Sequence, residues 1–291
     1  MDEPAFESGF LRASRVAIWG LGLMGGSLAM ALKGSCAELV GIDSHPNTVA
    51  RALDLGIVSR ADTHPARILP GTDLVVLAVP VGAILTSLAD LPAACPGRAV
   101  VIDLGSTKRE VVAAMARLPE RFDPVGGHPM CGKEKSSLGY AEAGLYLGAT
   151  FVLTALERTS EDAQACAEEV VRAAGARPLW MEAEAHDRVV AATSHMPYLL
   201  ASALAKATSL ESAALVGPGF RSTTRLAGSS TAMMMDILKT NTENIRVAMS
   251  KLKEALAEYE ALLEEGDFRL LAEALEKDAE HYQHLISGSV R

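Results

Sequence analysis

The sequence has no excess of basic residues and few aromatic ones. Lys and Arg together number 27 against 36 Asp and Glu, and the formal net charge is -9. A surface of this sign repels polyanions, so we expect no binding to nucleic acid or to an anionic membrane. With 291 residues and 49% hydrophobic residues, the chain can bury two cores, and a small molecule is the expected partner.

Long apolar runs are also missing. The most apolar stretch, LVVLAVPVGAIL, is too short to span a bilayer and contains Pro80 and Gly82. The amino-terminal MDEPAFESGF is acidic and lacks the basic start and apolar core of a signal peptide. We therefore expect a cytoplasmic protein with no membrane partner.

Cysteines are few and show no metal-ligand spacing. No CxxC pair occurs, which fits a reducing compartment where the thiols act as small core residues. The four cysteines are Cys36, Cys95, Cys131 and Cys166.

The first half of the sequence alternates short apolar runs with helical patterns. Helices are expected to begin near Met24, Pro46, Gly82 and Lys108. Continuous apolar strands separated by helices indicate a parallel sheet covered on both faces, so the fold class is α/β with a doubly wound, Rossmann-type domain. The predicted strands are 15–19, 38–43, 73–79 and 99–103, with further strands near 122–127 and 150–154.

The second half is rich in Ala, Leu, Met, Glu and Lys at helical spacing. It predicts long helices at 183–208, 231–265 and 267–286, the last two separated at Gly266 and Asp267. We expect domains at 1–180 and 181–291, the second all-α. Helices such as AATSHMPYLLASALAKA carry few charges, which favours a homodimer formed through the helical domain.

A dinucleotide-binding signature follows the first strand. Gly20, Gly22 and Gly25 in VAIWGLGLMGGSLA form GxGxxG at the start of a helix. Asp43 ends the second strand, where a carboxylate accepts hydrogen bonds from the hydroxyls of the adenosine ribose. Leu23 and Met24 lie within the motif. The alternative is a glycine-rich turn with Asp43 as a helix cap.

The expected cofactor is NAD. No Arg or Lys follows Asp43 until Arg51, whereas a 2′-phosphate requires nearby cationic donors. Val79, Pro80 and Ser106 follow two strand ends and are expected to line the nicotinamide end of the groove. Ser106 has a structural alternative as cap of a helix beginning at Thr107.

His128 lies in FDPVGGHPM, after the expected sixth strand, and Pro129 keeps its backbone extended. An imidazole there can accept a proton near neutral pH, as alcohol oxidation by hydride transfer requires. A loop histidine bonded to backbone groups is the alternative.

The sequence resembles the prephenate and arogenate dehydrogenases of tyrosine biosynthesis. The matching elements occur in family order: GLGLMGGSLA, DLGSTK, GGHPMCGKEKS, LYLGATFVLT, AHD at 185–187, SHMPYLLASAL and FRSTTRLAGSS. The resemblance implies NAD-dependent oxidation at C4 of a cyclohexadienol ring, coupled to loss of the ring carboxylate as CO2.

The resemblance also assigns roles to single residues. It implies that His128 is the base, that Ser106 bonds the same hydroxyl or His128, and that Arg225 grips a substrate carboxylate. Glu134 is placed near the pocket mouth, and His195 close to the substrate. His186 and Asp187 are expected to start the long helix and tie the domains together. A structural role for these two residues is at least as good an interpretation as a catalytic one.

One position departs from the family pattern. Many prephenate-specific members read SHLPH, whereas this chain reads SHMPY and places Tyr198 at the substrate side chain. Tyrosine can donate a hydrogen bond but carries no positive charge. Prephenate is the favoured substrate, with arogenate, or both, as the alternative.

The remaining expectations concern regulation, metals and rival activities. The chain ends soon after its last helix, so feedback by tyrosine is expected as competition at Arg225. The histidine spacings provide no compact metal-ligand set, and hydride chemistry needs no metal. Rival interpretations are a beta-hydroxyacid dehydrogenase or a dinucleotide-sensing protein without activity.

Overall fold

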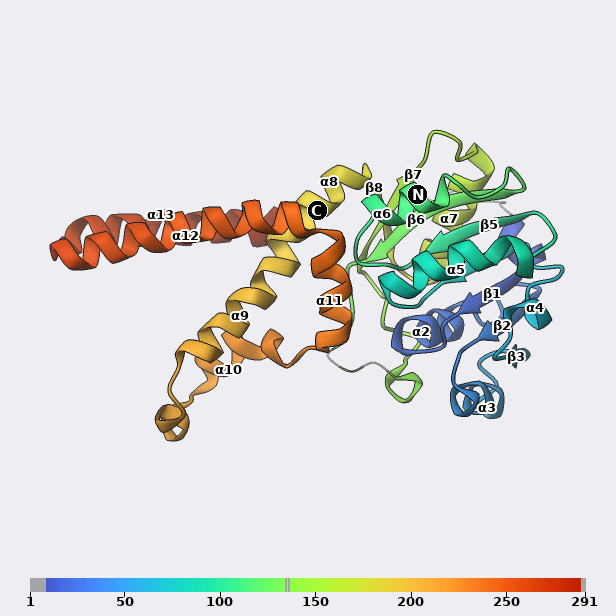
Figure 1. Cartoon of the computed structure of the whole chain (residues 1–291), viewed down its shortest axis with the longest axis horizontal. Helices are drawn as coiled ribbons and strands as arrows, with labels where there is room; N and C mark the ends of the chain where they lie inside the picture. The colour runs from blue at the N-terminus through green and yellow to red at the C-terminus, as the bar shows by residue number, and fades with distance from the viewer. Residues whose placement is uncertain (1–8, 134, 136, 289–291) are drawn as a thin grey trace, which may run out of the picture. The chain divides into compact units, whose positions relative to one another are not determined.

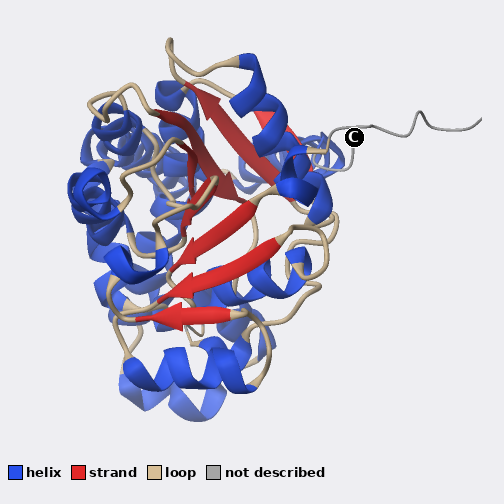
Figure 2. Cartoon of the chain, turned by 90° about the vertical axis from the view of Figure 1, so that its right-hand side faces the viewer, coloured by secondary structure: helices blue, strands red, loops and turns tan. Residues whose placement is uncertain are grey.

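The structure is a computed structural model that describes residues 9–133, 135 and 137–288. The chain divides into two compact units, Met1–Thr242 and Glu243–Arg291. The first unit holds an eight-stranded sheet with the order β3-β2-β1-β4-β5-β6-β7-β8, and helices lie on both sides of the strands (Figures 1 and 2). The strands are β1 (Arg15–Trp19), β2 (Glu38–Ile42), β3 (Arg60–Asp62), β4 (Leu74–Leu77), β5 (Ala99–Asp103), β6 (Phe122–Pro129), β7 (Thr150–Ala155) and β8 (Arg177–Trp180).

The helices of the first unit fall into two groups along the chain. Those before and between the strands are α1 (Phe10–Ala13), α2 (Leu23–Leu32), α3 (Pro46–Asp54), α4 (Pro65–Ile68), α5 (Val81–Ala94), α6 (Arg109–Met115), η1 (Leu138–Tyr140) and α7 (Glu161–Ala173). Those following the sheet are α8 (Ala183–Val190), η2 (Ala191–His195), α9 (Met196–Ala207), η3 (Leu210–Leu215), α10 (Pro218–Thr224), η4 (Arg225–Gly228) and α11 (Thr231–Thr240).

Two long helices make up almost all of the described part of the second unit. They are α12 (Thr242–Glu265) and α13 (Phe268–Gly288). Gly266 separates them with a φ of +69°, a conformation that costs glycine little. Among the described residues, no helix combines the length and apolar character needed to cross a membrane.

Side chains alternate between two cores because the strands are pleated. In β4, Leu74 and Val76 join the core with α2 and α7, whereas Val75 and Leu77 join the core with α4 and α5. Every residue of β4 is buried, as expected of a strand covered on both faces. The predicted α/β class, a Rossmann-type domain followed by helices, is confirmed.

The parallel arrangement holds for most of the sheet but not for all of it. β6 and β7 pair antiparallel, so the expected parallel arrangement is wrong for this one pair of strands. A parallel crossover usually contains a helix, and in the described residues between these strands only the short η1 turn is helical. The antiparallel pairing is consistent with this connection.

His128 also lies differently from expectation. It belongs to β6 itself, where it pairs with Val152 of β7, and does not follow the strand. Its backbone is thus held by the pairing with β7, which fixes the side chain more firmly than a loop would.

Candidate functional site

The turn between β1 and α2 is shaped for close backbone approach. Gly20 has a φ of +104°, and a Cβ there would lie 2.5 Å from the Ala78 carbonyl oxygen. A Cβ on Gly25 would lie 1.8 Å from the Gly20 carbonyl oxygen. Gly22 precedes α2, whose first turn has no side-chain cap and no acidic residue. Its first N–H groups are therefore suited to a pyrophosphate, and these residues fit a dinucleotide.

Asp43 lies immediately after β2 and is bonded to this turn. Its Oδ2 accepts a hydrogen bond from the Leu21 N–H at 2.9 Å, and its Oδ1 accepts one from the His45 N–H at 2.9 Å. A carboxylate has about four acceptor positions, so it retains capacity for ribose hydroxyls. The glycines and Asp43 thus form one connected turn.

Val79 and Pro80 occupy the neighbouring strand end, between β4 and α5. Val79 is half-buried and Pro80 is exposed at the N-cap of α5. The Gly82 N–H in the first turn of α5 donates to Oδ2 of Asp236, on α11, at 3.1 Å. This contact fixes α11 against the strand end expected to meet the nicotinamide.

A relay of three side chains ends at His128. Nδ1 of His128 lies 2.8 Å from Nε2 of His186, and Nδ1 of His186 lies 2.8 Å from Oδ1 of Asp187. An ionised carboxylate only accepts hydrogen bonds, so His186 donates from Nδ1 and its neutral Nε2 accepts from His128. The proton of neutral His128 is thereby held on Nδ1. Its Nε2 is left as the basic nitrogen.

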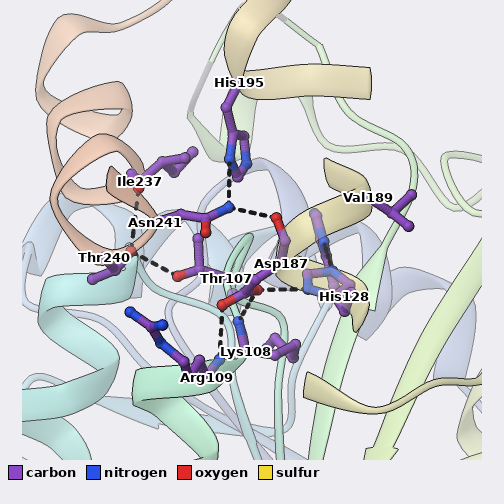
Figure 3. A network of polar contacts seen from close by, with 12 residues as sticks. Thr107, Lys108, Arg109, His128, Asp187, Val189, His195, Ile237, Thr240 and Asn241 are labelled. Carbon is purple, nitrogen blue, oxygen red and sulfur yellow. Dashed lines mark hydrogen bonds and ion pairs between the residues drawn. The ribbon is translucent and has the colours of Figure 1, made fainter. Parts of the chain in front are cut away.

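Asp187 is held as an anion by its surroundings. It is buried, and it accepts the N–H groups of Lys108 at 2.7 Å and of Arg109 at 3.0 Å at the start of α6 (Figure 3). Burial raises the pKa of Asp187, but the hydrogen bonds from His186 and from these N–H groups outweigh it and leave the pKa below its ordinary value. Asp187 therefore ties α8 to α6 while orienting His186.

Lys108 is fully buried next to the end of β6. Its ammonium donates to the Asp103 carboxylate and, at 2.6 Å, to the carbonyl oxygen of Gly127. Asp103 also accepts the N–H of Gly127 at 3.0 Å. Burial lowers the pKa of Lys108, and the charges of Asp103 and Asp187 oppose that shift. This ion pair fixes the end of β6 next to β5.

The environment keeps His128 neutral. Burial lowers its pKa well below the ordinary value, and any positive charge on His186, Lys108 or His195 acts in the same direction. A neutral imidazole with its proton on Nδ1 can accept a proton at Nε2. The arrangement therefore suits a general base.

His195 and Asn241 extend the network into the helices. His195 ends the π-helix η2, and Asn241 follows α11. The Asn241 amide nitrogen donates to the Asp187 carbonyl oxygen at 2.6 Å and lies 3.2 Å from Nδ1 of His195 (Figure 3). Burial lowers the pKa of His195 to about 4. Segments far apart in the sequence thus meet around one buried site.

Comparison with protein-family models gives two matches. The model described as "Prephenate dehydrogenase, nucleotide-binding domain" matches residues 28–179. The model described as "Prephenate dehydrogenase, dimerization domain" matches residues 182–277. The chain belongs to the prephenate dehydrogenase family. The family predicted from the motifs is confirmed.

Individual relatives agree with this family. The prephenate dehydrogenase of Bacillus subtilis (strain 168) is 34% identical over 237 residues, which cover 78% of this chain and 64% of the relative, so the chain spans less than two thirds of that protein. The cyclohexadienyl dehydrogenase of Zymomonas mobilis is 30% identical over 274 residues, covering 88% of this chain and 91% of the relative. A crystal structure of prephenate dehydrogenase from A. aeolicus in complex with hydroxyphenyl propionate and NAD+ has a TM-score of 0.87 at 30% identity. It covers 95% of this chain and 99% of its own.

The structure places the other predicted site residues less closely around His128. Ser106 is half-buried between β5 and α6, and within the described residues its hydroxyl makes no hydrogen bond. It caps no helix, because α6 begins at Arg109 with Lys108 at its N-cap, so the alternative of Ser106 as the cap of a helix beginning at Thr107 is wrong. Tyr198 is half-buried in the first turn of α9, and Arg225 is exposed at the start of η4, which packs against α9. Glu134 lies outside the described residues.

Several residues of the buried network around His128 were not among the predicted site residues. His186 and Asp187 belong to the AHD element that carries the family resemblance, and Lys108 ends DLGSTK, so a signal was present for these three. Asn241 lies in an ordinary helical stretch with no such signal. Groups of three or more potential ligands placed to hold a metal ion do not occur in the described part of the chain.

Proposed function

We propose that this chain catalyses the NAD-dependent oxidative decarboxylation of prephenate to 4-hydroxyphenylpyruvate, with release of CO2. The observation that carries the proposal is the relay from Asp187 through His186 to His128. It provides an oriented, neutral base at the carboxyl end of the sheet, in the same unit as the glycine turn and Asp43.

His128 is the proton acceptor in this proposal. Its Nε2 takes the proton of the ring hydroxyl. The resulting imidazolium donates a hydrogen bond from Nδ1 to Nε2 of His186, and the Asp187 carboxylate accepts the hydrogen bond from Nδ1 of His186. NAD+, held by the glycine turn and Asp43, supplies the acceptor for the hydride leaving the ring carbon. Because loss of CO2 makes the ring aromatic, the protein has only to orient the substrate and remove one proton.

Binding of the substrate is assigned to residues around α9. Arg225 is proposed to bind a substrate carboxylate, a task suited to its two parallel N–H donors. Tyr198 meets the substrate side chain through its hydroxyl, and Ser106 bonds the ring hydroxyl. Glu134 at the pocket mouth and His195 within the site complete the set.

Arogenate is the second candidate substrate. Prephenate ends in a pyruvyl group and arogenate in an amino acid, and Tyr198 stands at that end in place of a histidine. The Zymomonas relative is named a cyclohexadienyl dehydrogenase, which is consistent with a wider choice.

The proposal extends to assembly and regulation. The dinucleotide domain is 1–180 and the helical domain 181–291, and two copies associate through the helices, in line with the description of the second family model. Val247, Leu256, Leu263 and Phe268 on α12 and α13 are exposed within the chain and provide an apolar surface for this contact.

The four unpaired cysteines fit a cytoplasmic location. Tyrosine is proposed to compete with the substrate at Arg225.

The test is the formation of NADH by purified protein supplied with NAD and either prephenate or arogenate. Turnover of one substrate supports the proposal and shows the preference set by Tyr198. Binding of NAD without turnover of either would contradict it, and 3-hydroxy acids would then be assayed.

A further inference from the structure

His195 has two ring nitrogens in different situations. The residue is 1% exposed, and its Nδ1 faces the amide nitrogen of Asn241 at 3.2 Å. Its Nε2 is also buried and meets no hydrogen-bond partner among the residues that the structure describes. Buried polar atoms are nearly always paired, so this nitrogen has a specific use.

The hydrogen bonds of Asn241 decide which nitrogen carries the proton. A backbone carbonyl only accepts, so the atom lying 2.6 Å from the Asp187 carbonyl oxygen is the amide nitrogen of Asn241. The second hydrogen of the same nitrogen points at Nδ1 of His195, which therefore accepts. In the neutral ring the remaining proton lies on Nε2.

His195 is neutral under ordinary conditions. Burial is the main cause that lowers its pKa to about 4, with the charge of His186 acting in the same direction and that of Asp187 opposing it. The buried Nε2–H group is thus a donor without an acceptor. Such a group costs free energy unless a ligand supplies the acceptor.

The position of His195 indicates which ligand that is. It lies on the helical stretch between α8, which carries His186, and α9, which carries Tyr198. It also lies close enough to His128 for its charged form to lower the pKa of that residue. The π-helix that ends at His195 is a kind of turn frequent at functional sites.

We propose that Asn241 is a positioning residue that locks His195 with its proton on Nε2, so that this N–H donates to an oxygen acceptor of the bound reactants. The acceptor is a planar oxygen, either of the substrate carboxylate or of the nicotinamide carboxamide. The inference rests on the proposed function for the identity of those reactants, but not for the tautomer itself.

The tautomer is measured first, without turnover. Long-range ¹⁵N–¹H NMR spectra of ¹⁵N-histidine-labelled protein distinguish the two neutral forms, and the signals missing from His195→Gln identify this residue. We expect the proton on Nε2 in the unaltered chain. Asn241→Asp presents only acceptors and should move the proton to Nδ1. Thr240→Val is the matched control, since it removes the neighbouring hydrogen bond to Thr107 at 2.8 Å and leaves His195 alone.

A pair of His195 variants tests the donor while Asn241 stays intact. The side-chain amide nitrogen of glutamine can occupy the position of Nε2, whereas asparagine is too short to reach it. His195→Gln should retain roughly tenfold more kcat/KM than His195→Asn, the effect of one hydrogen bond. A rise confined to the KM for prephenate or arogenate identifies the substrate as the acceptor. A weaker affinity for NAD, measured by fluorescence titration, identifies the cofactor.

Two results overturn the proposal. One is a proton on Nδ1 of His195 in the unaltered chain. The other is equal kcat/KM and equal NAD affinity for the Gln and Asn variants. If the unaltered protein turns over neither substrate, the proposed function fails, while the tautomer and the NAD titrations still decide the role of Asn241.

Discussion

Nδ1 of His128 lies 2.8 Å from Nε2 of His186, and this contact joins β6 to α8 across 58 positions of sequence. On its own, a neutral imidazole can carry its proton on either nitrogen. The contact with His186, itself held by Asp187, leaves one of the two forms. The basic nitrogen of His128 is therefore selected by tertiary structure.

Replacing the base itself should abolish most of the turnover. We expect His128→Asn to lower kcat by about 10²–10⁴-fold, the usual contribution of general base catalysis. NAD affinity should be unchanged, because His128 is not part of the glycine turn. Rates of NADH formation and a fluorescence titration check the two parts. Near-normal kcat in this variant would remove His128 from the mechanism.

Replacing His186 should disturb the base without removing it. In His186→Leu the Nδ1–H of His128 loses its acceptor and the proton is free to occupy Nε2, so we expect kcat to fall by about 10–100-fold. The exposed His64 provides the control variant His64→Asn, because among the described residues its ring is bonded only to Asp62 and Thr63 of its own turn. Equal losses in both variants would show that the effect is not specific to the relay.

The buried histidines should make the protein less stable in acid. The folded pKa of His195 is about 4, below the ordinary value of about 6.5, so the unfolded chain takes up a proton first as the pH falls. The contribution of this residue to the free energy of unfolding is fully present above about pH 6.5. It is lost as the pH falls from about 6.5 to about 4, and the loss is roughly 3 kcal/mol at most. Urea unfolding of His195→Gln should therefore depend less on pH in this window. Parallel curves for the two proteins would contradict this assignment.

The buried ion pair between Lys108 and Asp103 should matter much more than one on the surface. Lys108→Met leaves the Asp103 carboxylate buried without its cation, and we expect the free energy of unfolding to fall by about 3–5 kcal/mol. Lys133 is 2.8 Å from Glu142 in a solvent-exposed pair, so Lys133→Met should cost no more than about 1 kcal/mol. Denaturant titrations compare the two, and similar values would show that burial is not the deciding factor.

The glycine turn should tolerate no side chain at Gly25. An added Cβ lies 1.8 Å from the Gly20 carbonyl oxygen, so Gly25→Ala must displace the turn, and we expect the affinity for NAD to fall at least ~10-fold. Gly97→Ala is the control, since nothing lies within 4 Å of its added Cβ. Thermal unfolding separates lost affinity from lost structure. Unaltered NAD binding by Gly25→Ala would place the pyrophosphate elsewhere.

The central strands could be predicted because their sequences are continuously apolar. β4 and β5 are buried on both faces and read as hydrophobic runs. β3 and β8 were missed because each is an edge strand of three or four residues with exposed positions, and β8 contains Pro178. Their strand form depends on the neighbour beside them, which sequence patterns do not contain.

The helices after the sheet show a similar limit. One helix was expected over 183–208, and the structure has α8, a π-helix and α9 in that span. α- and π-turns use the same residues, and the choice between them depends on packing around His195.

The candidate site also contains residues that sequence patterns reveal and residues that only tertiary structure brings together. The glycines and Asp43 were found because a strand, a turn and a helix that follow one another define them locally. His128 was found because its motif is specific. Its relay was not found, since His186 and Asp187 reach it only through the docking of α8 on α6.

Asp187 both holds the start of α6 and orients His186, and this double role has a consequence for synthesis of the chain. The ribosome releases β6 well before α8, so the nascent polypeptide first contains His128 without a partner to choose its proton. Chemical competence appears only when the segment from Ala183 to Asn241 docks. A product truncated before that segment retains the glycine turn and Asp43, yet has no means of orienting the base.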